Sequence, residues 1–198
     1  MRSLFVTAGT SAQQTQAYEI NVAYQRNIAA IRADSNLSDE GKVSEMAAAY
    51  TSAAETLRGL QSQEQASDSA RRTSLMREVF GIQGTPDPSA AISYRDAQDR
   101  AASLVNERDA VRLIEQADLS GDEHLARAAA RSAYENGWGD ALTAFAASRP
   151  QLASKLQELR ELQPSIDRIL GAGWSFAIVK PTELERYSDV TIARLARS

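Results

Sequence analysis

The chain has 198 residues, no cysteine and a single histidine, His124, and 22 basic against 26 acidic side chains give it a net charge of −4. The lack of cysteine excludes disulfides and thiolate metal sites, and the acidic balance supplies no basic surface for nucleic acid. No stretch approaches the roughly 20 apolar residues of a membrane span. We therefore expect a soluble, mainly α-helical protein without a cofactor, and neither nucleic acid nor a membrane as its partner.

The first predicted element is a helix over residues 13–33. Its apolar residues recur at three- and four-residue steps: Ala17, Ile20, Tyr24, Ile28 and Ile31. Ser38 then stands as a candidate N-cap, and Asp39 and Glu40 follow in the first turn of a second helix, where acids favour the helix dipole.

The second helix carries a heptad pattern over Val43, Met46, Tyr50, Ala53, Leu57 and Leu60. Two amphipathic helices with a short connection predict a long antiparallel helical hairpin. We expect four of these side chains to be buried against the first helix, within one chain or in a self-association seam: Val43, Met46, Tyr50 and Leu57.

Patterns that resemble chemical sites have better structural explanations. Residues 34–45 carry oxygen ligands at calcium-loop spacing, but Asp39 stands where that loop needs glycine, and a helix cap explains the same residues. His124 has no cysteine near it, so we expect it at the surface and not on a metal. Acidic pairs such as 122–123 fall in predicted first turns. We expect no catalytic and no metal-binding residue, and we do not expect an enzyme.

The middle of the chain contains two changes in composition. Residues 61–73, QSQEQASDSARRT, have almost no apolar face, and they are either a solvated continuation of the second helix or a hinge. Residues 81–88 hold two glycines and two prolines, which predicts a loop and the main boundary. The expected domains are an N-terminal helical hairpin over 1–80, a helical bundle over 85–171, and an arm with a short terminal helix over 172–198.

The second half predicts a small helical bundle. Helices are expected over 89–116, over 122–136 with Ser120 and Glu123 as a capping box, onward to residue 148, and after Pro150, with a last short turn over 164–170. Residues 134–150 are similar to one half of a tetratricopeptide unit, although no second copy follows at the repeat length. An isolated helical pair is the simpler interpretation.

The tail differs from the helices before it. Trp174, Phe176 and Ile178 alternate with smaller residues, which predicts a short extended C-terminal arm ended by Pro181. Either these side chains pack on their own chain, or the arm adds a strand to a partner. Residues 4–7 are the other β-like stretch with which this arm is expected to pair. A final short helix is expected from Thr182 to Leu195.

Two stretches carry a resemblance to a family. IAAIRADSNLSDEGKVSEMAAAY (28–50) and LARAAARSAYENGWGDALTAFAASRPQ (125–151) resemble segments of small helical proteins from tailed phages and prophages of actinobacteria, which are found among virion structure and assembly genes. The resemblance covers about a quarter of the chain and carries no site residues. It implies a scaffold-, chaperone- or connector-like protein, made in the host cytoplasm and retained in some cases in the virion.

The leading hypothesis is a non-enzymatic protein that works by contact with itself or with a capsid, portal or tail protein. Its candidate interaction residues are Val43, Met46, Tyr50, Leu57, Trp174, Phe176 and Ile178. The alternative is a cellular adaptor or regulator in which residues 85–170 form a repeat-like groove for a peptide.

Overall fold

A computed structural model describes residues 11–82, 88–163 and 173–197, and these residues form helices and irregular segments without a strand. The chain divides into two compact units. Unit 1 comprises Met1–Ser67 and Pro164–Ser198, and unit 2 comprises Asp68–Gln163. The absence of strands from the described residues confirms the expected all-α class. The division between the units falls within one helix, at residues 67–68, whereas the sequence places the main boundary at 81–88.

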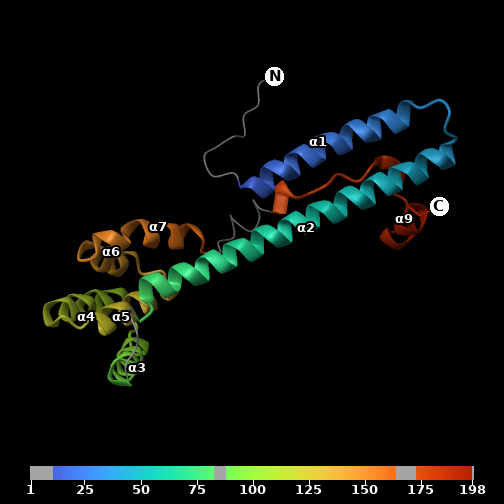
Figure 1. Ribbon diagram of the computed structural model, residues 1–198. Coiled ribbons are helices and arrows are strands. Elements are labelled where there is room, and N and C mark those ends of the chain that lie inside the picture. The colour runs from blue at the N-terminus through green and yellow to red at the C-terminus, as the bar shows by residue number, and fades with distance from the viewer. Residues whose placement is uncertain (1–10, 83–87, 164–172, 198) are drawn as a thin grey trace. The chain divides into compact units, whose positions relative to one another are not determined.

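Unit 1 is built on a helical hairpin. Helix α1 spans Ala12–Ala33 and helix α2 spans Asp39–Phe80, and the first part of α2 lies beside α1 (Figure 1). The Ser38 hydroxyl accepts a hydrogen bond from Gly41 N at 3.1 Å, so the predicted N-cap is confirmed. At the turn between the helices, Lys42 Nζ donates to Arg32 O at 3.0 Å.

The hairpin buries the residues that the heptad pattern predicts. Met46 and Ala47 share a core cluster with three side chains of α1, namely Tyr24, Ile28 and Ile31. Val43 and Tyr50 are half-buried and pack against the same cluster. Further along α2, Leu57 is buried with Ala17, and Ile20 packs against them. The predicted face therefore closes within one chain.

Residues 61–73 are helical, which decides between the two interpretations of this stretch. The segment contains neither glycine nor proline, and Gln, Glu, Ala and Arg are strong helix formers, so helix propensity is enough to continue α2 without an apolar face.

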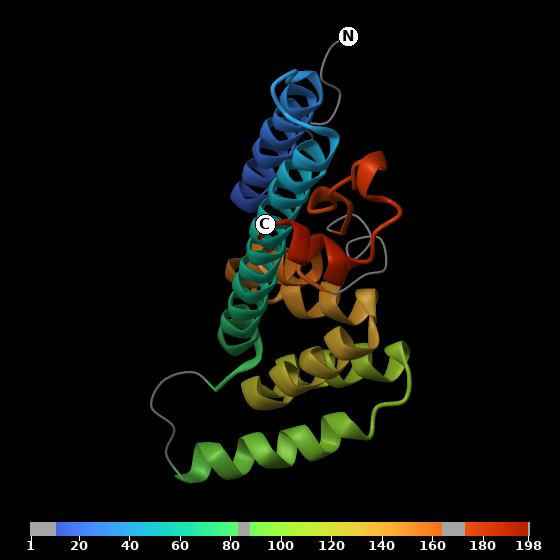
Figure 2. The ribbon, with the colours of Figure 1, turned by 90° about the vertical axis from the view of Figure 1, so that its right-hand side faces the viewer.

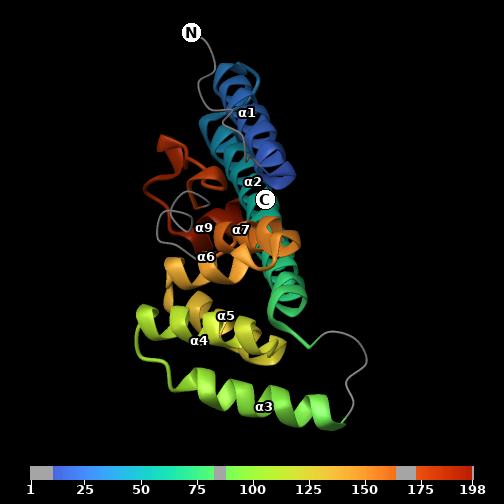
Figure 3. The ribbon, with the colours of Figure 1, turned by 90° about the vertical axis from the view of Figure 1, so that its left-hand side faces the viewer.

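Unit 2 holds the end of α2 and five further α-helices. They are α3 (Pro88–Ala102), α4 (Glu107–Ser120), α5 (Glu123–Asn136), α6 (Gly139–Ala147) and α7 (Ala153–Glu161), and a 3₁₀ turn, η1 (Pro150–Leu152), precedes α7. Helix α5 packs against α3, α4 and α6 (Figure 3). Its buried side chains are mostly alanine, which allows neighbouring helices to approach closely: Ala126, Ala128, Ala129, Ala130 and Ala133. The large side chains of the core include Phe80, Tyr134 and Phe145. The ring centroid of Phe80 lies 5.8 Å from that of Tyr134 and 6.4 Å from that of Phe145.

Two details of unit 2 differ from the prediction. The helix expected over 89–116 is broken, because Asn106 caps α4 by accepting from Asp109 N at 2.9 Å. The capping box at Ser120 is wrong as well. Gly121 is in the left-handed conformation with φ 69° and ends α4, and Asp122 caps α5 by accepting from Leu125 N at 3.0 Å.

The predicted C-terminal strand is wrong. Residues 173–175 are helical and 177–181 are irregular, and residues 4–7 lie outside the described residues. The backbone needs no partner strand here because side chains of α1 bind it. Asn21 Nδ2 donates to Ala177 O at 3.3 Å, and Tyr24 Oη donates to Val179 O at 2.9 Å.

The helix expected from Thr182 to Leu195 is also shorter than predicted. Thr182–Leu184 form a 3₁₀ turn, η2, and α9 spans Asp189–Leu195. Ser188 caps α9 by accepting from Thr191 N at 3.3 Å. The helix predicted to begin at Pro150 is present as η1 and α7, and the short turn predicted over 164–170 lies outside the described residues.

Candidate interaction surface

Residues 173–197, named here the C-terminal segment, lie along the α1–α2 hairpin of unit 1 (Figure 2). Three of its side chains enter the cores of the hairpin. Phe176 packs with Leu57, and Leu184 and Ile192 join the cluster around Met46. Burial of each such side chain contributes about 1.5–3 kcal/mol. The segment is therefore fixed on the hairpin by its inner face.

Polar contacts fix the same segment at both ends. In addition to the bonds from Asn21 and Tyr24, Ser44 Oγ donates to Leu195 O at 2.9 Å. The Arg32 guanidinium donates two hydrogen bonds to the Glu183 carboxylate, at 2.7 and 2.9 Å. The hydrogen bonds from Arg32 lower the pKa of Glu183 to about 2, and burial raises the pKa of Tyr24 to about 12. The carboxylate and the phenol therefore stay in these bonded forms at neutral pH.

Three large apolar side chains of the C-terminal segment are exposed among polar ones such as Glu185 and Asp189. Trp174 is 79% exposed, Val179 71% and Val190 83%. In the described part of unit 1, the other large apolar side chain with such exposure is Tyr18 on α1. A single exposed valine is ordinary, but three large apolar side chains on one short segment indicate a contact surface.

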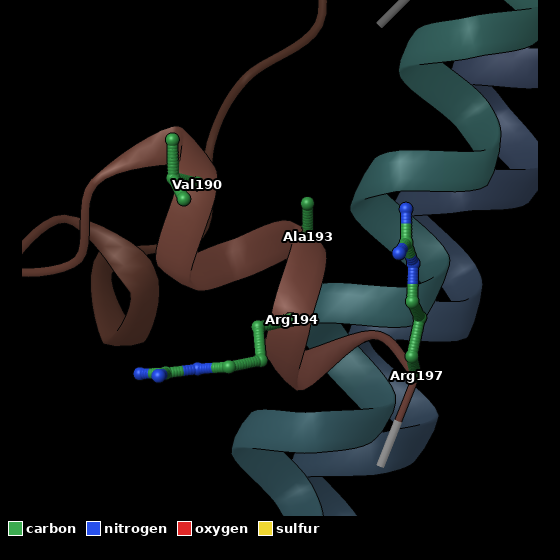
Figure 4. A pocket seen from close by; sticks show the side chains of 4 residues that line it. All are labelled: Val190, Ala193, Arg194 and Arg197. Carbon is green, nitrogen blue, oxygen red and sulfur yellow. The ribbon is translucent and has the colours of Figure 1, made fainter.

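Helix α9 carries exposed charge as well. Val190, Ala193, Arg194 and Arg197 line an open hollow along α9 and the turn that follows it (Figure 4). Val190, Ala193 and Arg194 are three and four residues apart, which places them on one side of α9, and Arg197 lies in the turn after the helix. Both arginines are exposed, and among the described residues no carboxylate pairs with either. The acid of α9, Asp189, lies 3.8 Å from Lys180 Nζ.

Six of the seven residues predicted for interaction are buried or half-buried in unit 1. Met46, Leu57 and Phe176 are buried in the hairpin cores, and Val43, Tyr50 and Ile178 are half-buried against them. Trp174 is the exposed member of the set, so Phe176 packs on its own chain while the burial of Trp174 against a partner stays a prediction. The sequence analysis missed Val190 and the two arginines, although their helical spacing was a usable signal.

A second hollow in unit 1 has a mixed lining. It lies between the start of α2 and η2, and its charged side chains include Arg32, Lys42 and Glu183. These groups already bind one another or the backbone. Because Arg32, Lys42 and Glu183 already have partners, these three side chains are not free to bind a ligand in this hollow.

Unit 2 contains a network of buried arginines with matched charges. Arg149 Nη2 lies 2.7 Å from both Asp118 Oδ1 and Glu123 Oε2, and Arg127 Nε donates to Glu123 Oε1 at 2.6 Å. Arg127 also binds the last-turn carbonyl of Val79 at the end of α2. Burial raises the pKa of Glu123, but the two arginines outweigh it and hold that pKa below its ordinary value. Each charge has its partner, so the network stabilises the bundle.

His124 is half-buried, contrary to the surface position expected for it. Its ring meets the Tyr94 ring edge-on with centroids 6.0 Å apart, and its Nδ1 atom is buried without a hydrogen-bond partner. The packing of α3 on α5 covers it, which the sequence did not reveal. Over the described ranges, no group of three His, Cys, Asp or Glu side chains is arranged to hold a metal ion.

Unit 2 also has a groove between α6 and α7. Leu142 and Leu156 are buried along it, while Thr143, Ala153 and Gln157 line it as exposed residues. This groove is the feature of the structure nearest to the peptide groove expected over residues 85–170.

The chain matches no protein-family model, no curated protein and no solved structure. Within the described residues, no helix combines the length and the apolar character that crossing a membrane requires. The function therefore has to be inferred from the surface of the chain itself.

Proposed function

We propose that this chain is a non-catalytic helical protein that binds another protein through the outer face of its C-terminal segment. One observation carries the proposal: Trp174, Val179 and Val190 are 79%, 71% and 83% exposed on a segment that Phe176, Leu184 and Ile192 fix to the hairpin. Tryptophan is enriched at the energetic centres of protein interfaces. Burying these three side chains in a partner removes apolar surface from water at little conformational cost, because the segment is already fixed.

The more specific proposal is a structural or assembly component of a phage particle, with a scaffold-, chaperone- or connector-like role. Its support is the sequence resemblance of residues 28–50 and 125–151. The first stretch forms the turn of the α1–α2 hairpin, and the second forms α5 and α6. The proposed partner is a second copy or a capsid, portal or tail protein.

Site-specific photo-crosslinking in the producing cell tests the proposal. A photoreactive amino acid at position 174 or 190 is expected to form a defined adduct with a protein, and the same amino acid at Arg26 of α1 serves as the control. Arg26 is exposed in the same unit but lies outside the C-terminal segment. Equal adducts at all three positions, or none at 174 and 190, would count against the proposal. A coat, portal or tail protein in the adduct would support the phage role.

A second candidate is an adaptor that captures a peptide in the α6–α7 groove of unit 2. The buried Leu142 and Leu156 with exposed Ala153 favour it. An arginine at Ala153 would fill this groove from its exposed side. Loss of partner binding in Ala153→Arg, with binding retained in a Trp174 variant, would favour the adaptor over the C-terminal surface.

A further inference from the structure

We infer that the partner of the C-terminal segment presents an acidic, apolar protein segment to α9, with carboxylates for Arg194 and Arg197 and apolar side chains for Val190 and Ala193. This inference rests on the proposed function and adds the chemistry of the partner. Residues 186–197 contain three arginines and one aspartate in a chain of net charge −4. This stretch therefore carries a net charge of +2 on an acidic protein.

The two basic side chains that precede α9 in the C-terminal segment, Lys180 and Arg186, already have partners within the chain, and so does Arg32 of α1. Arg32 binds Glu183, the Lys180 ammonium lies near Asp189, and the Arg186 guanidinium stacks 4.9 Å from the Tyr187 ring. Arg194 and Arg197 have no such partner among the described residues. A guanidinium presents a planar fork of N–H donors that matches a carboxylate, so these two side chains are free to bind one on another molecule.

Their surroundings single out Arg194 and Arg197 in unit 1. The two arginines line a hollow together with the exposed Val190 (Figure 4). A protein segment can place apolar side chains against Val190 and carboxylates against the two arginines at the same time. A polyanion such as nucleic acid would gain only the two phosphate contacts and would meet repulsion from the net charge of −4.

The test selects binders for the full-length chain from a library of short random peptides. Each selected peptide is then measured against three charge variants. Arg194→Glu/Arg197→Glu reverses the charge of the pair, and Arg194→Gln/Arg197→Gln removes that charge without reversal. Arg26→Glu/Arg58→Glu makes the same charge change elsewhere in unit 1. All four positions are exposed, and unchanged helicity and melting temperature verify that each variant is folded.

We expect a class of peptides whose affinity falls at least about tenfold, or about 1.4 kcal/mol, in the reversed variant and less in the glutamine variant. The Arg26/Arg58 control should bind this class normally. Its members should be rich in Asp and Glu next to apolar residues, and raised salt should weaken their binding. Replacement of their acids by lysine should restore binding to the reversed variant.

Three results would overturn the inference. One is that no selected peptide depends on Arg194 and Arg197. Another is that the dependent peptides are neutral or basic. The last is that duplex DNA or inorganic phosphate occupies the face more tightly than the acidic peptides and displaces them. A second copy as the true partner would appear as self-association lost in the reversed variant. If photo-crosslinking at 174 succeeds while this test fails, the proposed function stands without its acidic partner.

Discussion

The ion pair between Arg32 and Glu183 should make the attachment of the C-terminal segment depend on pH. The hydrogen bonds from Arg32 lower the pKa of Glu183 from 4.5 to about 2. A difference of that size corresponds to about 3 kcal/mol at about 1.4 kcal/mol per pH unit. Because the two side chains are 45% and 32% exposed, solvent screening reduces the expected contribution to about 1 kcal/mol.

The direction follows from the lowered pKa. The ionised carboxylate stabilises the attached state, so the contribution is complete above pH 4.5 and is lost as the pH falls toward about 2. Glu183→Gln removes it at every pH. At pH 7 the variant should therefore detach its C-terminal segment about fivefold more readily than the wild type, and near pH 2 the two proteins should be equal.

Hydrogen exchange measures this detachment at single amides. Leu184 N–H donates to Pro181 O at 2.9 Å and Ile192 N–H donates to Ser188 O at 2.9 Å, so both report the segment. Protection factors corrected for intrinsic exchange give the free energy of opening at each pH. Glu185→Gln, an exposed neighbour, is the matched control and should change nothing. Equal protection in the wild type and Glu183→Gln at pH 7 would refute the reasoning, as would a difference that persists at pH 2.

Three other substitutions test the two units by denaturation followed by circular dichroism. Leu57→Ala should cost about 2–5 kcal/mol because its side chain is 1% exposed in the hairpin core, and no change would mean that this face is open to water. Arg149→Ala should cost about 1.5–3 kcal/mol by leaving Asp118 without its cation and Glu123 with Arg127 alone, and a loss below about 0.5 kcal/mol would show that the network is solvated. Gly121→Ala should cost about 1 kcal/mol because φ is 69°, although its Cβ would meet no atom, and a gain in stability would contradict the strain.

The hairpin was predictable because its pattern is local and repeated. Apolar residues at heptad spacing define one face of a helix regardless of the rest of the chain, and a short connection leaves an antiparallel neighbour as the simplest partner. Met46 and Leu57 are accordingly buried where the pattern places them. The sequence did not decide between helix and hinge for the polar stretch 61–73, because only helix propensity favours the helix there and propensity is a weak indicator.

The C-terminal segment was not predictable by the same reasoning. Alternation of Trp174, Phe176 and Ile178 is typical of a strand, but the backbone there is bound by Asn21 and Tyr24, residues more than 150 positions away. A contact of that kind has no local signature. The same dependence on distant residues explains why Trp174 faces water and Phe176 does not, and why packing against Tyr94 covers His124.

The two units have a consequence for synthesis. Unit 1 draws on both ends of the chain, with Asp68–Gln163 of unit 2 made between them. During synthesis the α1–α2 hairpin therefore emerges from the ribosome first, and Phe176, Leu184 and Ile192 emerge only after the whole of unit 2. Until then, the flank of the hairpin that these side chains cover stays open to water, and domains generally fold as units in the order of their synthesis. Nascent chains should expose this flank to chaperones or to a waiting assembly partner, whereas finished chains should not.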